Sequence, residues 1–416
     1  MSNVFASDVQ KQFFKTGVQD ELRDSLPMTF VSEIDTENAE YIVNRYGSDI
    51  VAQSTPNSIY RRASGFTYNR DKKSIDEIAT ATDEILYQEL MREGFDVVAD
   101  RKDKHTFALR TAIHRHAAET TRLGAGSVLD NEVLAGSTSA GTPITLSTSN
   151  PDDVVATVVQ ILQEQNAYGM ENPFVMMTPR QAKFFNVFSM GAGFSTADKA
   201  LTNSIFTVAG GTQVIKGANG FGGLDVIVTN ELPRSRVMTL TDELDATDTL
   251  VINGVTFTVV ASPSAAGDVD QGADAEGTID AFVAAINNSE YALAGVASTS
   301  GEYVEVSQAN RTILDTAGVR ARKLTATTFE VSGFTDLTIT ETGDEMTVGA
   351  QTTHMLAGAY DSTSICLPSK GMRVDEKPLA AISGTGIHGY ELTSFQMHDA
   401  VVWTKNSPKI VDIYTV

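Results

Sequence analysis

Glycine and serine motifs give the first candidates for chemistry. Gly384, Gly386 and Gly389 match the G-x-G-x-x-G pattern of dinucleotide-binding loops. Such a loop needs a helix behind it, because the helix N-terminus holds the pyrophosphate. Residues 390–403 are typical of a strand, so we interpret the motif as a glycine-rich loop. Residues 193–197 approach the G-x-S-x-G nucleophile elbow but end in alanine within a glycine-rich stretch, which argues against a hydrolase.

Three histidines, His105, His114 and His116, lie close together in one helical segment. A zinc pair on a helix takes positions four residues apart, whereas His114 and His116 are two apart and point to different sides. We therefore expect packing or surface histidines and no metal site.

The acidic residues Asp268, Asp270, Asp274 and Glu276 could surround a calcium ion. The spacing departs from the EF-hand pattern, since Gly272 and Ala273 occupy the two positions at which an EF-hand loop has a metal ligand and its invariant glycine. A solvated acidic loop is the interpretation that we favour. No set of residues forms a recognisable active site, so we expect no enzyme and no cofactor.

The composition narrows the class of protein. The 416 residues predict about two or three domains, and the single cysteine, Cys366, excludes an intrachain disulfide. The 53 acids and 31 bases give a net charge of −22. This balance argues against a nucleic-acid reader, which needs a surplus of Lys and Arg on one face. No run of residues is apolar enough for a membrane span, and the N-terminus does not look like a signal peptide.

The pattern of apolar residues predicts the elements that would position any site. Residues 96–123 have apolar residues at helical spacing and are followed by glycines, which predicts one long helix. A second amphipathic helix is expected over 154–165, after Pro151. Short apolar runs at 174–177 and 224–229 predict buried strands.

A locally basic segment, residues 51–80, precedes the long helix. Its β-prone runs around 59–60 and 66–68, separated by Ser64 and Gly65, predict a long hairpin without a core of its own. A solvated loop and an arm that reaches an acidic neighbour both remain open. The candidate contact residues of the arm are Arg61, Arg62, Arg70, Lys72 and Lys73.

Composition changes at residues 236–352, which carry 18 acids and 5 bases, a net −13, against −9 for the rest. Alternating residues over 250–260 with Asn253-Gly254 predict a hairpin, and 278–287 predict one helix. Further strands are expected at 303–307, 328–331 and 337–340. This self-contained α+β pattern, between flanks of similar texture, predicts a domain inserted into a host domain.

Taken in order, these pieces resemble the major capsid proteins of tailed bacteriophages, with the Hong Kong 97-type fold. The resemblance covers about 300 residues outside the insert. It lies in the order of arm, basic hairpin and long helix, and in the segments LDNEVLAG at 129–136, PFVMMTP at 173–179, FGGLDVIV at 221–228 and the closing strands 390–402 and 407–413.

The resemblance implies an α+β capsid fold with an inserted β-rich α+β domain. The implied layout is an N-terminal arm (1–50), an extended hairpin (51–82), the spine helix with the first part of the peripheral domain (83–150), the first part of the axial domain (151–235), an inserted surface domain (236–352), and the axial remainder with the closing peripheral strands (353–416).

The function implied is a shell protein that assembles with itself, as hexamers and pentamers, into an icosahedral head around double-stranded DNA, without reading its sequence. No charged propeptide precedes the arm, so a separate scaffolding protein is implied, along with a portal and potential decoration proteins. The implied location is the virion, after assembly in the cytoplasm of a bacterial host. The alternatives are an encapsulin-like bacterial compartment and a β-rich surface adhesin.

Overall fold

The structure is a computed structural model, and the chain in it divides into two compact units. The first unit takes residues 1–124 and 360–408, and the second takes 125–359 and 409–416. The residues described are 14–16, 18, 31–34, 41–47, 68–86, 97–137, 141–147, 149–165, 173–191, 213–215, 224–242, 244–360, 362–368, 371–380 and 387–416.

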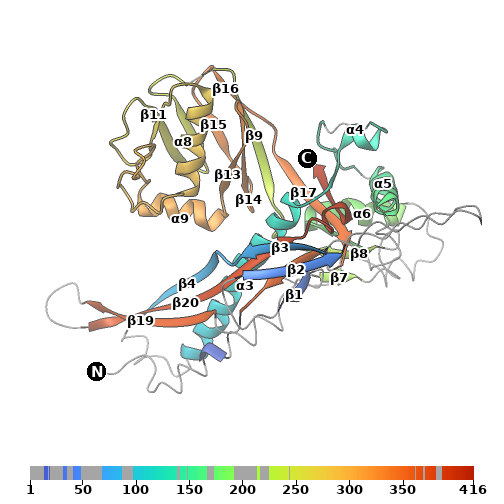
Figure 1. Ribbon diagram of the computed structural model, residues 1–416, viewed down its shortest axis with the longest axis horizontal. Helices are drawn as coiled ribbons and strands as arrows, with labels where there is room; N and C mark the ends of the chain where they lie inside the picture. Colours follow the sequence, from blue (N-terminus) through green and yellow to red (C-terminus); the bar gives the residue numbers. More distant parts are fainter. Residues whose placement is uncertain are drawn as a thin grey trace, which may run out of the picture. The chain divides into compact units, whose positions relative to one another are not determined.

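The first unit is built on the long helix α3 (Val97–Leu123), as expected from its apolar spacing. Leu109, Ile113 and Ala117 recur on one side of α3 and are fully buried. The helix packs against three strands of one mixed sheet, β4, β18 and β20. This sheet consists of β1 (Val31–Ile34), β18 (Thr363–Cys366), β20 (Ile387–Val402), β19 (Met372–Ala380) and β4 (Glu77–Leu86) (Figure 1).

The end of α3 lies directly on β20. A side chain at Gly124 would bring its Cβ within 2.5 Å of the Cβ of Val402, so only glycine fits there. The long helix thus packs against the closing strand. β20 ends at Val402, as expected for the closing strand 390–402, and the Trp403 carbonyl accepts hydrogen bonds from the backbone N–H groups of Asn406 and Ser407.

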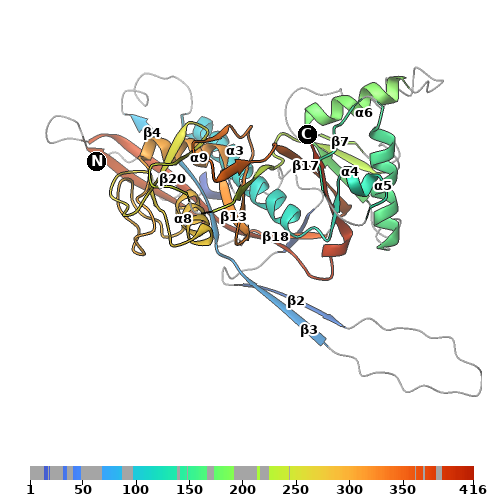
Figure 2. The ribbon, with the colours of Figure 1, turned by 90° about the horizontal axis from the view of Figure 1, so that it is seen from above.

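The chain before α3 contains a separate two-stranded antiparallel ribbon, made of β2 (Tyr41–Gly47) and β3 (Tyr68–Ser74) (Figure 2). The strand β3 lies in the segment expected to form a hairpin. Its partner β2 lies before that segment, within the residues assigned to the arm. The hairpin pairing thus begins at Tyr41 rather than after residue 50, and the runs at 59–60 and 66–67 fall outside the described residues.

The second unit has a larger mixed sheet, of which one part is accompanied by three described helices. This part comprises β5 (Ser127–Leu129), β6 (Pro173–Met177), β7 (Gln213–Ile215), β8 (Asp225–Val228), β17 (Thr352–Ala359) and β21 (Ile410–Thr415), with α4 (Asn131–Leu134), α5 (Pro151–Glu164) and α6 (Pro179–Gly191). Side chains of α5, β6, β8, β17 and β21 share one buried apolar cluster.

The expected helix at 154–165 and the strands at 174–177 and 224–229 are confirmed by α5, β6 and β8. The helix α6 was not expected, because Thr178-Pro179 looked like the end of a strand. The structure shows a capping box there. The Gln181 side chain accepts from the backbone N–H of Thr178 at 2.7 Å, and the Thr178 hydroxyl accepts from the Gln181 N–H at 3.3 Å.

The acidic part of the second unit begins with β9 (Arg234–Leu240), which pairs on one edge with β14 and on the other with β17 and β16. It continues through β10 (Thr249–Ile252), β11 (Val255–Val260), β12 (Asp268–Asp270), α8 (Ala275–Asn287), α9 (Gln308–Ala317), β13 (Arg320–Thr325), β14 (Thr328–Gly333), β15 (Ile339–Glu341) and β16 (Met346–Val348). The hairpin turn expected at Asn253-Gly254 is confirmed, since β10 and β11 pair around these two residues at φ of 51° and 85°.

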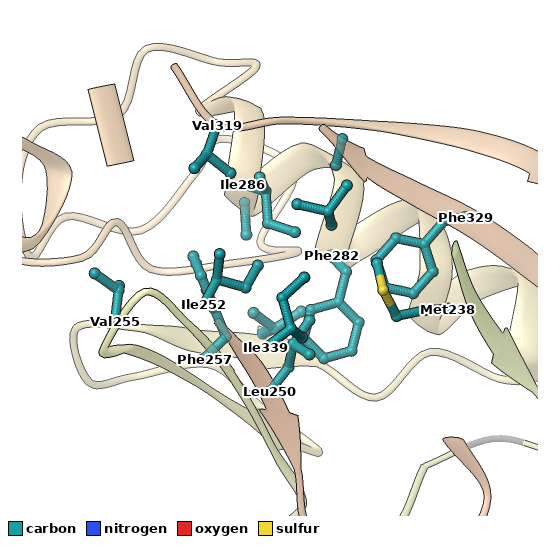
Figure 3. Packing of buried hydrophobic residues seen from close by; sticks show 14 of the residues in the cluster. Met238, Leu250, Ile252, Val255, Phe257, Phe282, Ile286, Val319, Phe329 and Ile339 are labelled. Carbon is teal, nitrogen blue, oxygen red and sulfur yellow. The ribbon is translucent and has the colours of Figure 1, made fainter. Parts of the chain in front are cut away.

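The apolar core of this acidic part is separate from the cluster beneath α5. Its buried members run from Met238 to Met346, and Figure 3 shows Phe282 of α8 among side chains from the strands, Leu250 and Ile339 included. Phe282 and Phe329 stack with ring centres 6.0 Å apart. Every buried residue of the cluster thus comes from the segment 236–352.

Two expectations within this part need correction. A strand was expected over 303–307, but Tyr303 and Val304 form only isolated bridges and Ser307 caps a helix, α9. The Ser307 hydroxyl accepts from the N–H of Asn310, and Gly318 ends the helix in the left-handed region. The segment 303–307 is therefore no regular strand, and a second helix, α9, follows it where only one helix was expected.

None of the described helices is long and apolar enough to cross a membrane.

Candidate assembly interface

The ribbon β2–β3 forms a two-stranded sheet of its own. It pairs with no third strand among those described. Its sequence contains four basic residues and one acid, Asp71. Arg45 and Arg70 occupy directly opposite register positions, two residues from the Val43–Lys72 pair. Like charges at opposite positions destabilise a strand pair, and an isolated two-stranded ribbon is marginal in water. A ribbon of this kind is an element that an acidic partner can stabilise.

The five predicted contact residues fall in different places. Arg61 and Arg62 lie outside the described residues. Arg70 and Lys72 lie in β3, at register positions on the Arg45 side of the ribbon. Lys73 follows Lys72 and therefore lies on the other face of the ribbon. Its Nζ lies 3.5 Å from Oδ2 of Asp399 in the same chain. Lys73 thus connects the ribbon to β20 of its own unit.

Asp399 is the centre of this connection, and its side chain is only 1% exposed. Its Oδ1 accepts hydrogen bonds from Nε2 of His116 at 3.3 Å and from the N–H of Ala400 at 2.7 Å. Burial alone would raise the pKa of Asp399, but the His116 hydrogen bond and the Lys73 charge outweigh it and hold the pKa below its ordinary value. The buried carboxylate therefore stays charged and joins α3, β3 and β20.

The helix histidines are packing residues, as expected for His105 and His114, which are both buried. Nδ1 of His105 lies 2.7 Å from the Ser394 hydroxyl, which fixes α3 against β20. Burial lowers the pKa of His114 to about 4, with Arg110 and Arg115 adding to the effect. Burial also lowers the pKa of His398 to about 4. Among the described residues no group of three or more His, Cys, Asp or Glu could hold a metal ion.

The remaining sequence motifs find structural roles. β20 begins at Ile387, within the G-x-G-x-x-G motif and directly after Gly386, so the motif leads into a strand and no helix, as expected. The Asp268 carboxylate accepts from the N–H groups of Ser264 and Ala265, and Asp274 caps α8. Glu276 forms an ion pair with Lys323. Residues 193–197 lie outside the described residues.

One hydrogen-bonded set was not foreseen. The Ser235 hydroxyl lies 2.8 Å from Nε2 of His354, and Nδ1 of His354 lies 2.9 Å from Oδ1 of Asp412. With Nδ1–H donating to the carboxylate, Nε2 accepts the hydroxyl proton, which is the geometry of a hydrolase triad.

All three side chains of this set are at least 97% buried, so a substrate cannot reach the hydroxyl in this conformation. The set joins β9, β17 and β21 at the point where the acidic part meets the rest of the second unit. Its members are 119 and 58 residues apart in the chain. No local pattern could have predicted it.

No protein-family model and no curated protein matches the sequence. The structure is similar to solved capsid structures. For the capsid of cyanophage P-SCSP1u, the identity is 8%, the TM-score 0.43, and the match covers 93% of this chain and 86% of that one. For the mature capsid of bacteriophage PhiM1 the values are 8%, 0.41, 94% and 86%. For the virus-like particle of Pyrococcus furiosus they are 9%, 0.38, 97% and 98%.

Proposed function

We propose that this chain is the major capsid protein of a tailed bacteriophage, which assembles with itself into a closed shell around double-stranded DNA. The observation that carries the proposal is the ribbon β2–β3. It is basic in a chain of net charge −22, and it pairs with no third described strand. A closed shell needs repeated heterologous contacts, and an arm completed by an acidic neighbour supplies one.

The rest of the first unit suits the same role. The helix α3 and the long strands β4, β19 and β20 give a stiff body, and Lys73 and Asp399 attach the ribbon to it. In the proposed layout the ribbon belongs to the extended hairpin and α3 is the spine helix of a Hong Kong 97-type fold. A scaffolding protein, a portal and decoration proteins are the further partners that this function would require or allow.

Assembly of the purified chain tests the proposal. Size-exclusion chromatography and negative-stain microscopy should show megadalton shells, and a chain that stays monomeric under all assembly conditions would overturn the proposal. Shells that hold co-purifying peptides in place of DNA would identify an encapsulin-like compartment.

The double variant Arg61→Glu, Arg62→Glu should block assembly while its circular dichroism stays unchanged, because each charge-assisted contact contributes about 1.5–3 kcal/mol when partly desolvated. The matched control reverses two exposed charges on α6, Arg180→Glu and Lys183→Glu. Normal shell yield from the double variant would remove Arg61 and Arg62 from the contact.

We also propose that 236–352 is an inserted surface domain. Ser235 and Thr352 are register partners on adjacent antiparallel strands, so the segment between them leaves and rejoins the sheet at one place. Its core is its own. An outward position suits its charge of −13, since inward it would face the phosphates of packaged DNA.

Deletion of 236–351, with Ser235 joined to Thr352 through Asn-Gly, tests this proposal. The two-residue link matches the hairpin loop that the register pair requires. Shells of unchanged diameter without surface knobs are expected. Aggregated or monomeric protein would place the segment in the shell floor.

A further inference from the structure

The loop that follows α8 exposes the most solvent-accessible large apolar side chains in the described part of the molecule. Tyr291 is 88% exposed, Leu293 75% and Val296 50%. The three residues lie within six positions of one loop, which we call the Tyr291 loop (288–302). Exposed apolar side chains that gather on one loop are typical of a binding site.

The Tyr291 loop is held in one shape by its own hydrogen bonds. Asn288 ends α8 at φ 46°, and its side-chain oxygen accepts from the hydroxyl of the buried Tyr303 at 3.0 Å. The N–H of Tyr291 donates to the Asn288 carbonyl at 2.9 Å, and the N–H of Val296 donates to Leu293 at 2.8 Å. An ordered loop loses little conformational entropy when a partner binds.

Glu290 closes the other side of the loop. Its Oε2 accepts from the N–H of Thr299 at 2.6 Å and from the N–H of Ser300 at 3.2 Å, and it also bonds the Thr299 hydroxyl. The side-chain hydrogen bond from Thr299, followed by that from Ser300, lowers the pKa of Glu290 to about 2. The carboxylate is therefore charged at any pH at which the protein would function.

Tyr291 itself has a φ of 51°, in the left-handed region that bulky side chains rarely adopt. The strained backbone presents its ring to solvent, where the ring contributes nothing to the core. Strain that a structure maintains at an exposed aromatic residue points to a function at that position.

The charge around the loop indicates what covers it. No basic residue occurs between Asp280 and Arg311. Arg311 is buried and bonded to Glu305 at 2.7 Å, while Lys323 is bonded to Glu276 and Asp280. A partner must therefore be basic. Two inserts of net −13 would repel each other, whereas the ribbon carries four bases and one acid.

We infer that the Tyr291 loop is the docking surface for the basic ribbon β2–β3 of a second copy of this chain. The inference rests on the proposed shell function. It gives the inserted domain 236–352 the role of strengthening the contact between neighbouring subunits. A Lys or Arg of the ribbon lies over the Tyr291 ring, and its aliphatic stem covers Leu293 and Val296. The charge of Glu290 adds electrostatic complementarity at the rim of the contact.

Disulfide trapping tests the contact, since the one native cysteine, Cys366, is buried and can be changed to serine. In assembled particles of the variant Cys366→Ser, Tyr291→Cys, Lys72→Cys, oxidation should give a ladder of linked chains on a non-reducing gel. The matched control replaces Tyr291→Cys with Leu324→Cys, another exposed apolar residue of the insert, and should give no ladder. Particles that form without a ladder would overturn the inference and leave the proposed function intact.

A second measurement does not depend on crosslinking. Tyr291→Ala should raise the protein concentration for half-maximal assembly by at least about tenfold, as expected for a central aromatic contact. Deletion of 236–351 should give the same shift, and Tyr291→Trp should keep the wild-type value. An unchanged concentration for Tyr291→Ala would overturn the docking site, while failure of the wild-type chain to assemble would overturn the function itself.

Discussion

The ribbon β2–β3 and the acidic segment 236–352 differ in what stabilises them and in the sign of their charge. The ribbon has two strands, no third described partner and a surplus of bases. The segment has two helices, a buried aliphatic and aromatic core, and a surplus of acids. In the described residues the segment has a core of its own, and each strand of the ribbon pairs only with the other. The difference teaches that one chain can contain both a region with its own core and a bare two-stranded element, for which we propose a partner in another molecule.

The two regions also use their charges differently. Within the acidic segment, Arg311, Arg322 and Lys323 all pair with acids of the same segment. In the ribbon, Arg45 and Arg70 are placed opposite each other, and the one ion pair described leads from Lys73 to Asp399. Ion pairs within a region favour its folding, and charges that face another molecule favour association.

The largest expected effect concerns the body that carries the ribbon. Ile113→Asp would place an unpaired carboxylate in the fully buried face of α3, at a cost of several kcal/mol, and should leave no soluble protein. Phe107→Asp, on the exposed side of the same helix, is the control and should fold normally. A soluble Ile113→Asp variant with a normal melting temperature would remove α3 from the core.

The next effect tests the independence of the acidic segment. Phe282→Ala removes a fully buried ring that stacks on Phe329 and should cost about 3–5 kcal/mol. Hydrogen exchange followed by mass spectrometry should show faster exchange over 238–348 alone, with α3 and α5 unchanged. Equal acceleration throughout the second unit would mean that the two apolar clusters unfold together. Leu324→Ala, at an exposed position, is the matched control.

Acidic pH should destabilise the first unit more than the segment 236–352, because this segment contains no histidine. Burial lowers the pKa of His114 and His398 to about 4 in the first unit. Between pH 6.5 and 4 the unfolded chain binds more protons at these sites, so stability is full above pH 6.5 and falls as the pH drops. The loss is on the order of 3 kcal/mol for each histidine.

Hydrogen exchange at pH 6.5, 5 and 4, corrected for intrinsic rates, should therefore show α3 losing protection before α8 does. His398→Gln should reduce the difference. The Tyr291 loop should keep its protection throughout, since Glu290 titrates only near pH 2. Loss of protection in α3 and α8 at the same pH would contradict the assignment of the pH dependence to His114 and His398.

The smallest effect concerns the attachment of the ribbon. Lys73→Ala removes a half-exposed cation from Asp399 and should cost no more than about 1 kcal/mol, because His116 and the Ala400 N–H still bond the carboxylate. The melting temperature should fall by a few degrees and proteolysis near 68–74 should become faster. Lys104→Ala, which breaks an exposed pair on α3, is the control. A ribbon as resistant as the wild type would show that Lys73 does not fix it.

Local patterns in the sequence predicted the elements whose stabilising contacts are near in the chain. The helix α3, the helix α5 after its proline and the Asn253-Gly254 turn all follow from spacing or turn chemistry within about thirty residues. Two missed helices had signals as well. Thr178 with Gln181 is a capping box, and Ser307 with Gly318 marks both ends of α9. Pro179, which is typical of the end of a strand, and the β-prone run 303–307 favoured other interpretations of these two segments.

The sequence alone determined the charge of each region, the length of the long helix, and the presence of a separate acidic segment. Only the tertiary structure decided that β2 pairs with β3, that Lys73 meets Asp399, and that Ser235, His354 and Asp412 form one buried set. It also decided that Tyr291 is exposed rather than buried. The physical reason is that helix spacing and turns depend on neighbouring residues. Strand partners and buried polar contacts depend on residues as many as 326 positions apart, which no local pattern encodes.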